Sequence, residues 1–186
     1  MVQKLDRQFY NREADLVASE LLGKCLVRND GGVLKAGRIV ETEAYLGAHD
    51  KASHSSKGLA ERTKTMFGPP GHAYVYIIYG MYYCMNVVTG AEGSGAAVLL
   101  RAIEPVENVE GKTCGPGLLS KAMNIDLSLN GVDLLGSEVY IADVDGNEQI
   151  SIAKGPRIGV GYAGRWAKRH LRFYIHGNKF VSKQRR

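Results

Sequence analysis

The sequence predicts an α+β fold, with a mostly antiparallel, curved β-sheet flanked by helices and a protruding β-hairpin. Three observations support this. Residues 33–45 are rich in β-branched residues and alternate with period two, which is typical of a strand. Residues 73–89 contain two apolar stretches around a Tyr79-Gly80-Met81 turn, as in a hairpin. Residues 14–22 carry apolar side chains at helical spacing.

The size and composition favour one domain. With 186 residues, 45% of them apolar and 23% charged, residues 1–186 can bury a core, and we expect only residues 183–186 to form a flexible basic tail. No apolar run reaches the roughly 20 residues of a membrane span, and the amino terminus lacks the apolar stretch of a signal peptide. We therefore expect no membrane partner and an intracellular protein, in the cytoplasm or nucleoid of a prokaryote or the nucleus of a eukaryote.

The three cysteines give no sign of cross-linking. Cys25, Cys84 and Cys114 are odd in number, far apart and never in a Cys-x-x-Cys pair. This spacing suggests neither a disulfide framework nor a zinc site, so the thiols are expected to be small buried groups.

Positive charge is concentrated at the carboxyl end. The formal net charge is +5, yet residues 154–186 hold ten Lys or Arg and no acidic residue, which leaves 14 basic and 19 acidic residues before them. The basic side chains are interleaved with aromatic ones: Arg157, Arg165, Lys168, Arg169 and Arg172 alternate with Tyr162, Trp166, Phe173 and Tyr174. A solvated face is one interpretation, but the pattern favours a surface for a polyanion, most commonly a nucleic acid.

The first elements are a helix and a pair of strands. Asn11 is expected to cap a helix over residues 14–22, which Gly23 ends. Residues 25–28 and 33–45 are expected to be antiparallel strands around a turn at 29–32.

The second of these strands carries an unusual face. Alternation places Ile39, Glu41, Glu43 and Tyr45 on one side. Glutamate is depleted in strands and costly to bury, so two on one face indicate either a solvated face or a site that uses a carboxylate.

A long polar segment, residues 47–71, follows this strand and is expected to be an ordered, functional loop. His49, Asp50 and His54 lie in it, but their spacing matches no common metal site, and we expect no metal. A hydrogen-bonding or stacking histidine is favoured.

The predicted hairpin at residues 73–89 is rich in tyrosine. Five of the ten tyrosines lie between Tyr74 and Tyr83. Each of them could simply pack on a sheet, but a large aromatic side chain at the tip, Tyr79, has little core to pack against. Gly80 can adopt the positive φ that such a tip requires.

Four further elements complete the chain. Residues 96–103 predict a buried strand whose Arg101 needs a partner, either Glu41 or Glu43. A helix is expected to open at Gly115-Pro116-Gly117 and run to Met123, with a weak signal for a phosphate at its start. Residues 139–142 and 149–152 are expected to form a hairpin around 145–147, and residues 172–175 a strand.

Together these features fit an enzyme that extrudes a nucleotide from DNA, because such an enzyme needs cations for phosphates, a wedge for the base stack and rings for the flipped base. The sequence resembles the alkyladenine (3-methyladenine) DNA glycosylase family over residues 8–181. The most specific matching segments are residues 37–47, 66–86, 98–105 and 157–174.

The resemblance implies roles for individual residues. Glu43 matches the general base that activates a water to attack C1′ of the flipped nucleotide, and Arg101 matches an arginine near that water and a backbone phosphate. For the base pocket, it implies Tyr45 and His54 on one wall, Tyr76 on the other, and Asn86 as the residue that screens purine substituents. Tyr79 matches the side chain inserted through the minor groove. Contacts with the DNA backbone are expected from Arg62, Met81, Tyr82, Arg157, Arg165 and Lys168.

Two departures from the family affect the expected DNA contacts. Where the family often has Thr-Pro-Arg-Asn, this chain has Ala60-Glu61-Arg62-Thr63, so only Arg62 is carried over. The connection after Pro105 is also short. Glu41 has no catalytic role in the family and is kept as a structural or supporting residue.

The implied reaction is hydrolysis of the N-glycosidic bond of alkylated or deaminated purines in double-stranded DNA by a monomer that starts base excision repair. The expected substrates are 3-methyladenine, 7-methylguanine, hypoxanthine and ethenoadenine. No cofactor is expected. A Schiff-base lyase step is not expected either, although Lys64 and Lys121 stay open as candidates.

Three other classes stay open. One is a protein that binds distorted DNA without cleaving it. Another is a helix-hairpin-helix glycosylase with Asp133 as its acid. The third is a carbohydrate glycosidase that uses Glu41 and Glu43 as its carboxylate pair.

Overall fold

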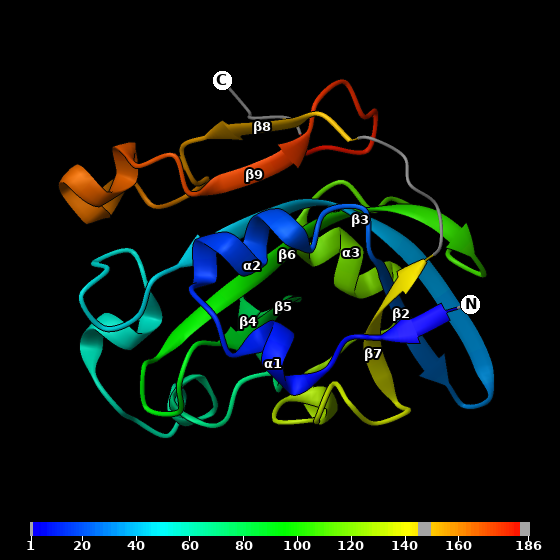
Figure 1. The fold of residues 1–186 in the computed structure, drawn as a ribbon, viewed down its shortest axis with the longest axis horizontal. Helices are drawn as coiled ribbons and strands as arrows, with labels where there is room; N and C mark the ends of the chain where they lie inside the picture. Colours follow the sequence, from blue (N-terminus) through cyan, green and yellow to red (C-terminus); the bar gives the residue numbers. More distant parts are fainter. Residues whose placement is uncertain (1, 145–149, 183–186) are drawn as a thin grey trace.

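The computed structural model describes residues 2–144 and 150–182, and its strands form one nine-stranded sheet. The order is β1-β7-β2-β3-β6-β5-β4, with β9 added beside β3 and β8 beside β9 (Figure 1). All the strand pairs are antiparallel. The strands are β1 (Val2–Lys4), β2 (Cys25–Asp30), β3 (Val33–Tyr45), β4 (Ala73–Ile78), β5 (Tyr82–Thr89), β6 (Ala96–Glu107), β7 (Val139–Val144), β8 (Ile152–Gly155) and β9 (Arg172–Ile175). This arrangement confirms the predicted α+β fold.

Short helices flank the sheet. They are the α-helices α1 (Arg7–Tyr10), α2 (Ala14–Glu20) and α3 (Pro116–Ala122) and the 3-10 helices η1 (His54–Lys57), η2 (Lys64–Phe67), η3 (Leu127–Leu129) and η4 (Gly161–Lys168). Helix α2 packs on β3 and β6 and lies over one face of the sheet (Figure 1). Among the described residues, no helix is long and apolar enough to span a membrane.

The predicted start of α2 was wrong. Asn11 is instead the C-cap of α1, a helix of four residues, which is too short to give a periodic pattern in the sequence. Asp6 is the N-cap of α1, and its side chain accepts a hydrogen bond from Phe9 N at 2.9 Å. Helix α2 has Glu13 at its N-cap without a side-chain hydrogen bond. Its buried residues, including Val17 and Ala18, still follow the predicted stripe, because burial against the sheet rather than the cap decides which face points inward.

Strand β3 has the predicted bounds, but two bulges interrupt its pairing with β6. Ile39 faces Ile103 while Glu41 faces Ala102, so Val40 is an extra residue; Thr42 then faces Leu100, so Arg101 is extra on β6. Ile39 and Val40 consequently both lie in the main core, and the prediction that Ile39 shares a face with Glu41 was wrong. Bulges redirect side chains, and here one of them carries Arg101.

The predicted hairpin is confirmed as β4 and β5. Met81 N donates to Ile78 O at 3.3 Å, and the two residues between them, Tyr79 and Gly80, have φ of 53° and 68°. Positive φ at both central positions is the turn geometry that matches the twist of a tight hairpin. The Tyr79 side chain is consequently held at the tip, 84% exposed.

A second predicted hairpin, over residues 139–152, was wrong. Strand β7 pairs with β1 and β2, whereas β8 pairs with β9. A period-two pattern identifies a strand but not its partner, and β7 and β8 each pair with strands other than the one next to them in sequence. The predicted turn at 145–147 and the predicted tail at 183–186 lie outside the described residues.

Two segments distant in sequence meet at one end of the molecule. The loop that holds η1 and η2 (cyan) and the segment of η4 (orange) both lie on the left of Figure 1. They are joined by the ion pair of Asp50 with Arg157. This end of the molecule holds part of the wall of the cavity described next.

Candidate active site

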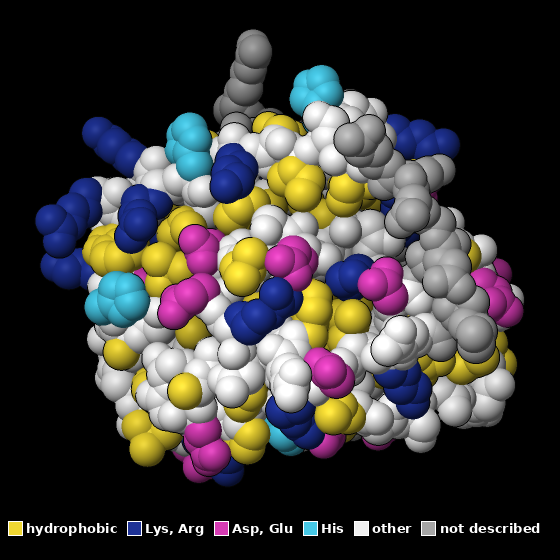
Figure 2. All heavy atoms as spheres, in the orientation of Figure 1, with side chains coloured by type: hydrophobic (Ala, Val, Ile, Leu, Met, Phe, Trp, Pro, Cys, Tyr) yellow, Lys and Arg dark blue, Asp and Glu magenta, His cyan; other side chains and the backbone are white. Residues whose placement is uncertain are grey.

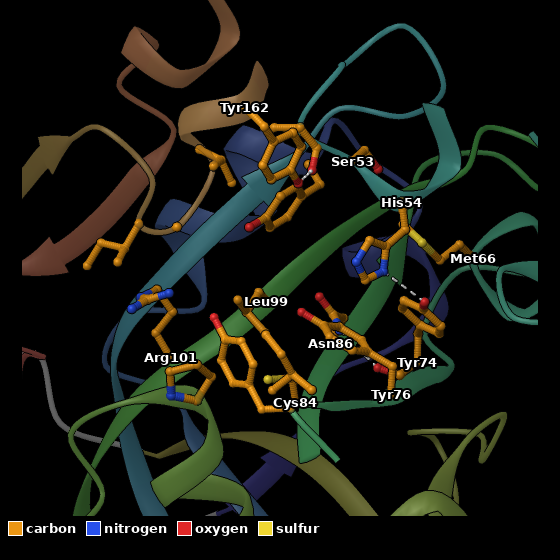
Figure 3. Close-up of a pocket in the computed structure, with 18 residues that line it drawn as sticks. Ser53, His54, Met66, Tyr74, Tyr76, Cys84, Asn86, Leu99, Arg101 and Tyr162 are labelled. Atoms are coloured by element: carbon orange, nitrogen blue, oxygen red, sulfur yellow. Dashed lines mark hydrogen bonds between the residues drawn. The ribbon is translucent and has the colours of Figure 1, made fainter. Parts of the chain in front are cut away.

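A cavity of about 480 Å³ opens between the hairpin, the loop after β3 and the segment before η4 (Figure 3). In Figure 3, His54, Tyr74 and Met66 lie on one side of it and Arg101 on the other. Its wall is formed by Tyr45, Ala52, Ser53, His54, Met66, Tyr74, Tyr76, Ile78, Tyr79, Cys84, Asn86, Leu99, Arg101, Pro116, Ile158, Gly159, Val160 and Tyr162. The wall therefore includes the predicted residues Tyr45, His54, Tyr76, Tyr79, Asn86 and Arg101.

The hairpin contributes alternate residues to this wall. On β4 these are Tyr74, Tyr76 and Ile78, and on β5 they are Cys84 and Asn86. Tyr76 pairs with Cys84 and Tyr74 with Asn86 across the two strands. Because side chains alternate along a strand, one face of the hairpin lines the cavity as a unit.

Glu43 lies directly behind the wall, with its side chain 0% exposed. Its Oε1 accepts from Ile158 N at 2.7 Å and lies 3.2 Å from Arg101 Nη1, and its Oε2 accepts from Tyr45 OH at 2.9 Å. These three partners line the cavity, whereas Glu43 is held one layer deeper. The predicted carboxylate is thus joined to the cavity by a phenol, an amide and a guanidinium.

Glu41 lies beside Glu43 in a second, fully buried cluster. It accepts from Arg101 Nε at 2.9 Å, from Arg172 Nη1 at 3.1 Å, and from Ser182 N and Oγ at 2.7 and 2.9 Å. The prediction that Arg101 needs Glu41 or Glu43 is confirmed, since it contacts both. Burial acts to lower the pKa of Arg101, but the charges of Glu43 and Glu41 outweigh it and raise that pKa.

Aromatic rings are packed together on one side of the cavity. The centres of the His54 and Tyr76 rings lie 4.6 Å apart. A hydrogen bond of 3.0 Å joins His54 Nδ1 to Tyr74 OH. Burial, aided by the charges of Arg62 and Lys57, lowers the pKa of His54 from 6.5 to about 4. His54 is therefore a neutral imidazole near pH 7, with one donor and one acceptor nitrogen.

This packing differs from the predicted two walls. His54 was expected beside Tyr45 and opposite Tyr76, but contact at 4.6 Å leaves no room for a base between the His54 and Tyr76 rings. The two rings form one continuous surface because the 3-10 helix η1 brings His54 onto the side of β4 that faces the cavity. Asn86 is buried beside them, and its Nδ2 donates to Tyr74 O at 3.0 Å, which leaves its carbonyl oxygen as an acceptor.

Charge and burial around the tyrosines make the wall a set of protonated phenols. Burial, and then the negative charge of Glu43, raises the pKa of Tyr45 well above 10. Burial also raises the pKa of Tyr76, and it raises that of the Cys84 thiol to about 11. These groups are thus neutral hydrogen-bonding partners near pH 7.

The residues predicted to contact the DNA backbone fall into two groups, one near the hairpin and one on η4. Met81 is 67% exposed and Tyr82 39% exposed, both at the hairpin, and Arg62 lies 5.7 Å from the centre of the Tyr76 ring. Arg165 and Lys168 are exposed on η4.

The prediction that Arg157 contacts the DNA backbone was wrong. Its guanidinium is buried, with Nη1 and Nη2 donating to the two oxygens of Asp50 at 2.5 and 2.9 Å, so it is not placed to contact a DNA phosphate. The basic pattern of residues 154–186 could not separate Arg157 from its exposed neighbours, because its partner Asp50 lies 107 residues away.

Sequence reasoning missed several groups in the wall. Tyr74 and Cys84 could have been found, since they share the alternation of Tyr76 and Asn86. The amide of Ile158 could not, because a backbone donor has no side-chain signature. Tyr162, 73% exposed with its hydroxyl donating to Ala52 O at 3.1 Å, had been named only as part of the basic segment.

The structure also bears on the alternative hypotheses for the function. Asp133, the proposed acid of a helix-hairpin-helix enzyme, pairs with Arg7 and is absent from the cavity wall. Lys64 pairs with Glu61, and neither it nor Lys121 lines the cavity. Within residues 2–144 and 150–182, no three His, Cys, Asp or Glu side chains form a group that could hold a metal.

Comparison with known proteins identifies the family of this chain. A family model described as Methylpurine-DNA glycosylase (MPG) matches residues 8–179.

Three bacterial relatives share the name "Putative 3-methyladenine DNA glycosylase". A protein of Legionella pneumophila (strain Corby) is 61% identical over 182 residues, which cover 98% of this chain and 100% of the relative. One from Anaeromyxobacter dehalogenans (strain 2CP-C) is 52% identical, covering 97% and 87%, and one from Myxococcus xanthus (strain DK1622) is 49% identical, covering 96% and 93%. This chain belongs to the methylpurine-DNA glycosylase family and is therefore a DNA glycosylase.

Proposed function

We propose that the protein removes alkylated or deaminated purines from double-stranded DNA by flipping the damaged nucleotide into the cavity and hydrolysing its N-glycosidic bond with a water activated by Glu43. The substrates are 3-methyladenine, 7-methylguanine, hypoxanthine and ethenoadenine, and the product is an abasic site that enters base excision repair. The protein acts as a monomer in the compartment that holds the DNA, which is the nucleoid if its source is bacterial, as its relatives are.

The observation that carries this proposal is the placement of Glu43 behind a cavity walled by aromatic rings. A cavity of about 480 Å³ is in the range of sites for small molecules, and five tyrosines and a histidine in its wall suit a flat heterocycle. A carboxylate at such a position can act both as a base and as a negative charge facing a cationic sugar.

The contacts of Glu43 leave acceptor capacity at one of its two carboxylate oxygens. A carboxylate oxygen accepts about two hydrogen bonds. The Ile158 amide and Arg101 occupy Oε1, whereas Tyr45 supplies one bond to Oε2. Because the Glu43 side chain is 0% exposed, the groups around it have to shift when a nucleotide enters, so that a water can donate to Oε2 beside the Tyr45 hydroxyl and face the sugar.

The substrates differ in what they demand of the enzyme. 3-Methyladenine and 7-methylguanine already carry positive charge and leave readily, so a poised water and the Glu43 charge suffice. Hypoxanthine is neutral and also needs a proton at N7. Neutral His54, which has one N–H donor, and ordered water are the candidates for supplying a hydrogen bond to it.

The hairpin tip and the basic surface suit a duplex. Tyr79 has a large, exposed side chain held by a tight turn. Such a side chain can insert between bases as a wedge through the minor groove. Lys and Arg side chains gather at the end of the molecule where η4 lies (Figure 2). Exposed Arg165 and Lys168 belong to this segment and suit phosphate contacts.

The test is release of a base from three duplexes that carry hypoxanthine, ethenoadenine or 7-methylguanine. Wild-type protein is expected to release at least one of them, while Glu43→Gln loses about 10² to 10⁴ in single-turnover rate but still binds the duplex. Glu107→Gln, an exposed glutamate at the end of β6, is the matched control and should act like wild type. Full activity of Glu43→Gln would overturn the assignment, and binding without release by wild type would favour the binding-only reading.

A further inference from the structure

The ion pair between Asp50 and Arg157 is the most thoroughly enclosed one near the cavity. Both side chains are 0% exposed, and two hydrogen bonds join the guanidinium to the two carboxylate oxygens. Paired geometry of this kind fixes orientation as well as distance. A buried pair is weak evidence for added stability, so its value has to be sought in what it positions.

The pair ties three chain segments together. Arg157 Nη1 donates to Ala44 O at 2.8 Å, and Nη2 lies 3.4 Å from its acceptor, Trp166 O. Asp50 accepts from Leu46 N at 3.2 Å and from Ala52 N at 3.0 Å. The end of β3, the loop after it and the η4 segment are therefore held against one another by two side chains.

Two of the three groups that hold Glu43 are attached to this pair. The guanidinium of Arg157 lies 4.7 Å from the centre of the Tyr45 ring, and Tyr45 OH donates to Glu43 Oε2. Ile158, whose N donates to Glu43 Oε1, is the next residue in the chain after Arg157. The third group, Arg101, is held separately by Glu41.

We propose that Asp50 and Arg157 are positioning residues for the glycosylase reaction: their buried ion pair sets the place of the Tyr45 hydroxyl and the Ile158 amide, and these two groups hold the Glu43 carboxylate at the cavity wall. The proposal rests on the assignment of Glu43 as the general base. It gives Arg157, which does not line the cavity, a role in the chemical step rather than in binding DNA.

Arginine is required at this position for a geometric reason. Its planar group donates to two carboxylate oxygens and two backbone carbonyls at once, and its Cζ lies over the Tyr45 ring, 4.7 Å from the ring centre. Lysine carries the same charge on a single nitrogen and cannot make this set of contacts. Arg157→Lys therefore keeps the charge while removing the geometry.

The carboxylate partner is in its charged form. Burial acts to raise the pKa of Asp50, but the hydrogen bonds and charge of Arg157, together with the Ala52 and Leu46 amides, lower it below its ordinary value. The ion pair is thus intact throughout the neutral pH range in which the reaction is to be measured.

The experiment compares Arg157→Lys and Asp50→Asn with wild type, with Arg7→Lys as the matched control. Arg7 also pairs with an aspartate far along the chain, Asp133, but neither residue lines the cavity. Single-turnover excision is measured at saturating protein, and binding is measured on undamaged duplex. We expect Arg157→Lys and Asp50→Asn to lower the maximal excision rate about 10- to 100-fold, as small misplacements of reacting groups do, with duplex affinity within about twofold of wild type.

A double variant separates positioning from general damage. Tyr45→Phe removes the hydroxyl that contacts Glu43 and so removes part of what the pair positions. Groups that act through one another give effects that do not add. Arg157→Lys combined with Tyr45→Phe should therefore lose less activity than the product of the single losses; full multiplication of the two effects would overturn the proposal.

A readout independent of base release is hydrogen exchange at the Ile158 amide. Exchange should speed up in Arg157→Lys and Asp50→Asn but not in Arg7→Lys. If wild type releases no base and this pattern is nevertheless seen, the proposed function fails while the positioning of Ile158 stands. If wild type releases bases and Arg157→Lys does so at the same rate, the positioning proposal fails while the function stands. Should Arg157→Lys not fold, Asp50→Asn, which keeps a carbonyl acceptor in place, decides by the same rate and exchange measurements.

Discussion

Glu41 and Glu43 share one guanidinium: Arg101 Nε donates to Glu41 Oε1 at 2.9 Å, and Arg101 Nη1 lies 3.2 Å from Glu43 Oε1. The two carboxylates differ in everything else that surrounds them. Glu41 is closed in by Arg172 and Ser182, whereas the other partners of Glu43 line the cavity. One carboxylate is therefore enclosed in the interior, and the other lies next to the cavity.

This difference predicts distinct effects for two similar substitutions. Glu41→Gln removes the charge that faces Arg101 and Arg172 inside the protein, and breaking a buried pair costs about 3 to 5 kcal/mol. We expect Glu41→Gln to lower the free energy of unfolding, measured with urea, by about that amount while base excision persists below the unfolding transition. Equal loss of excision in Glu41→Gln and Glu43→Gln, with unchanged stability, would instead support the glycosidase reading with two catalytic carboxylates.

The exposed hairpin tip predicts a loss of capture without a loss of stability. Tyr79→Ala removes a side chain that is 84% exposed, so the free energy of unfolding should stay within about 0.5 kcal/mol. Affinity for a damaged duplex should fall, because nothing then fills the gap left by the flipped nucleotide. Fluorescence anisotropy with damaged duplex measures this, and Tyr79→Phe, which keeps the ring, should bind as wild type does. Unchanged capture by Tyr79→Ala would remove the wedge hypothesis.

The neutral state of His54 predicts a pH dependence of stability. Its pKa is about 4 in the folded protein and 6.5 in an exposed reference, so below pH 6.5 the unfolded chain binds a proton that the folded one does not. The contribution of neutral His54 to the free energy of unfolding is fully present above pH 6.5 and is lost as the pH falls towards 4. Urea titrations between pH 4 and 7 should show this loss, and His54→Gln should flatten it.

The same histidine can be observed directly. An NMR titration should give an imidazole midpoint near 4 for His54. Burial is the main cause of the shift and the charge of Arg62 the next, so Arg62→Gln should raise the midpoint. A midpoint near 6.5 in wild type would contradict the neutral donor assigned to His54.

The basic face of η4 predicts a change in salt dependence. If Arg165 and Lys168 each neutralise one phosphate, changing both to glutamine should reduce the slope of log K against log salt by about 1.8. Binding of undamaged duplex at several salt concentrations measures this slope. Arg12→Gln is the matched control: Arg12 pairs with Glu20 of α2, and α2 packs on the side of β3 where Thr42, rather than Glu43, points. An unaltered slope in the double variant would show that η4 does not contact DNA.

Much of the fold followed from local pattern. The bounds of β3 and β9 and the Ala73–Thr89 hairpin matched the prediction, because alternation, turn residues and apolar stretches report on backbone conformation within a few residues. What failed was strand pairing: β7 and β8 were predicted as partners but pair elsewhere. Pairing depends on contacts between distant segments, which a local pattern does not contain.

By itself, the sequence determined that a strand with Glu41 and Glu43, a tyrosine-rich hairpin and a basic carboxyl end exist in this chain, since residue type and spacing fix these. Only the tertiary structure decided which glutamate meets the cavity, that His54 packs on Tyr76, and that Arg157 is buried against Asp50 rather than offered to DNA. The physical reason is the same in each case. The state of a polar side chain depends on partners that folding brings from other parts of the chain, such as Arg101 for Glu41, 60 residues away, and Arg157 for Asp50, 107 residues away.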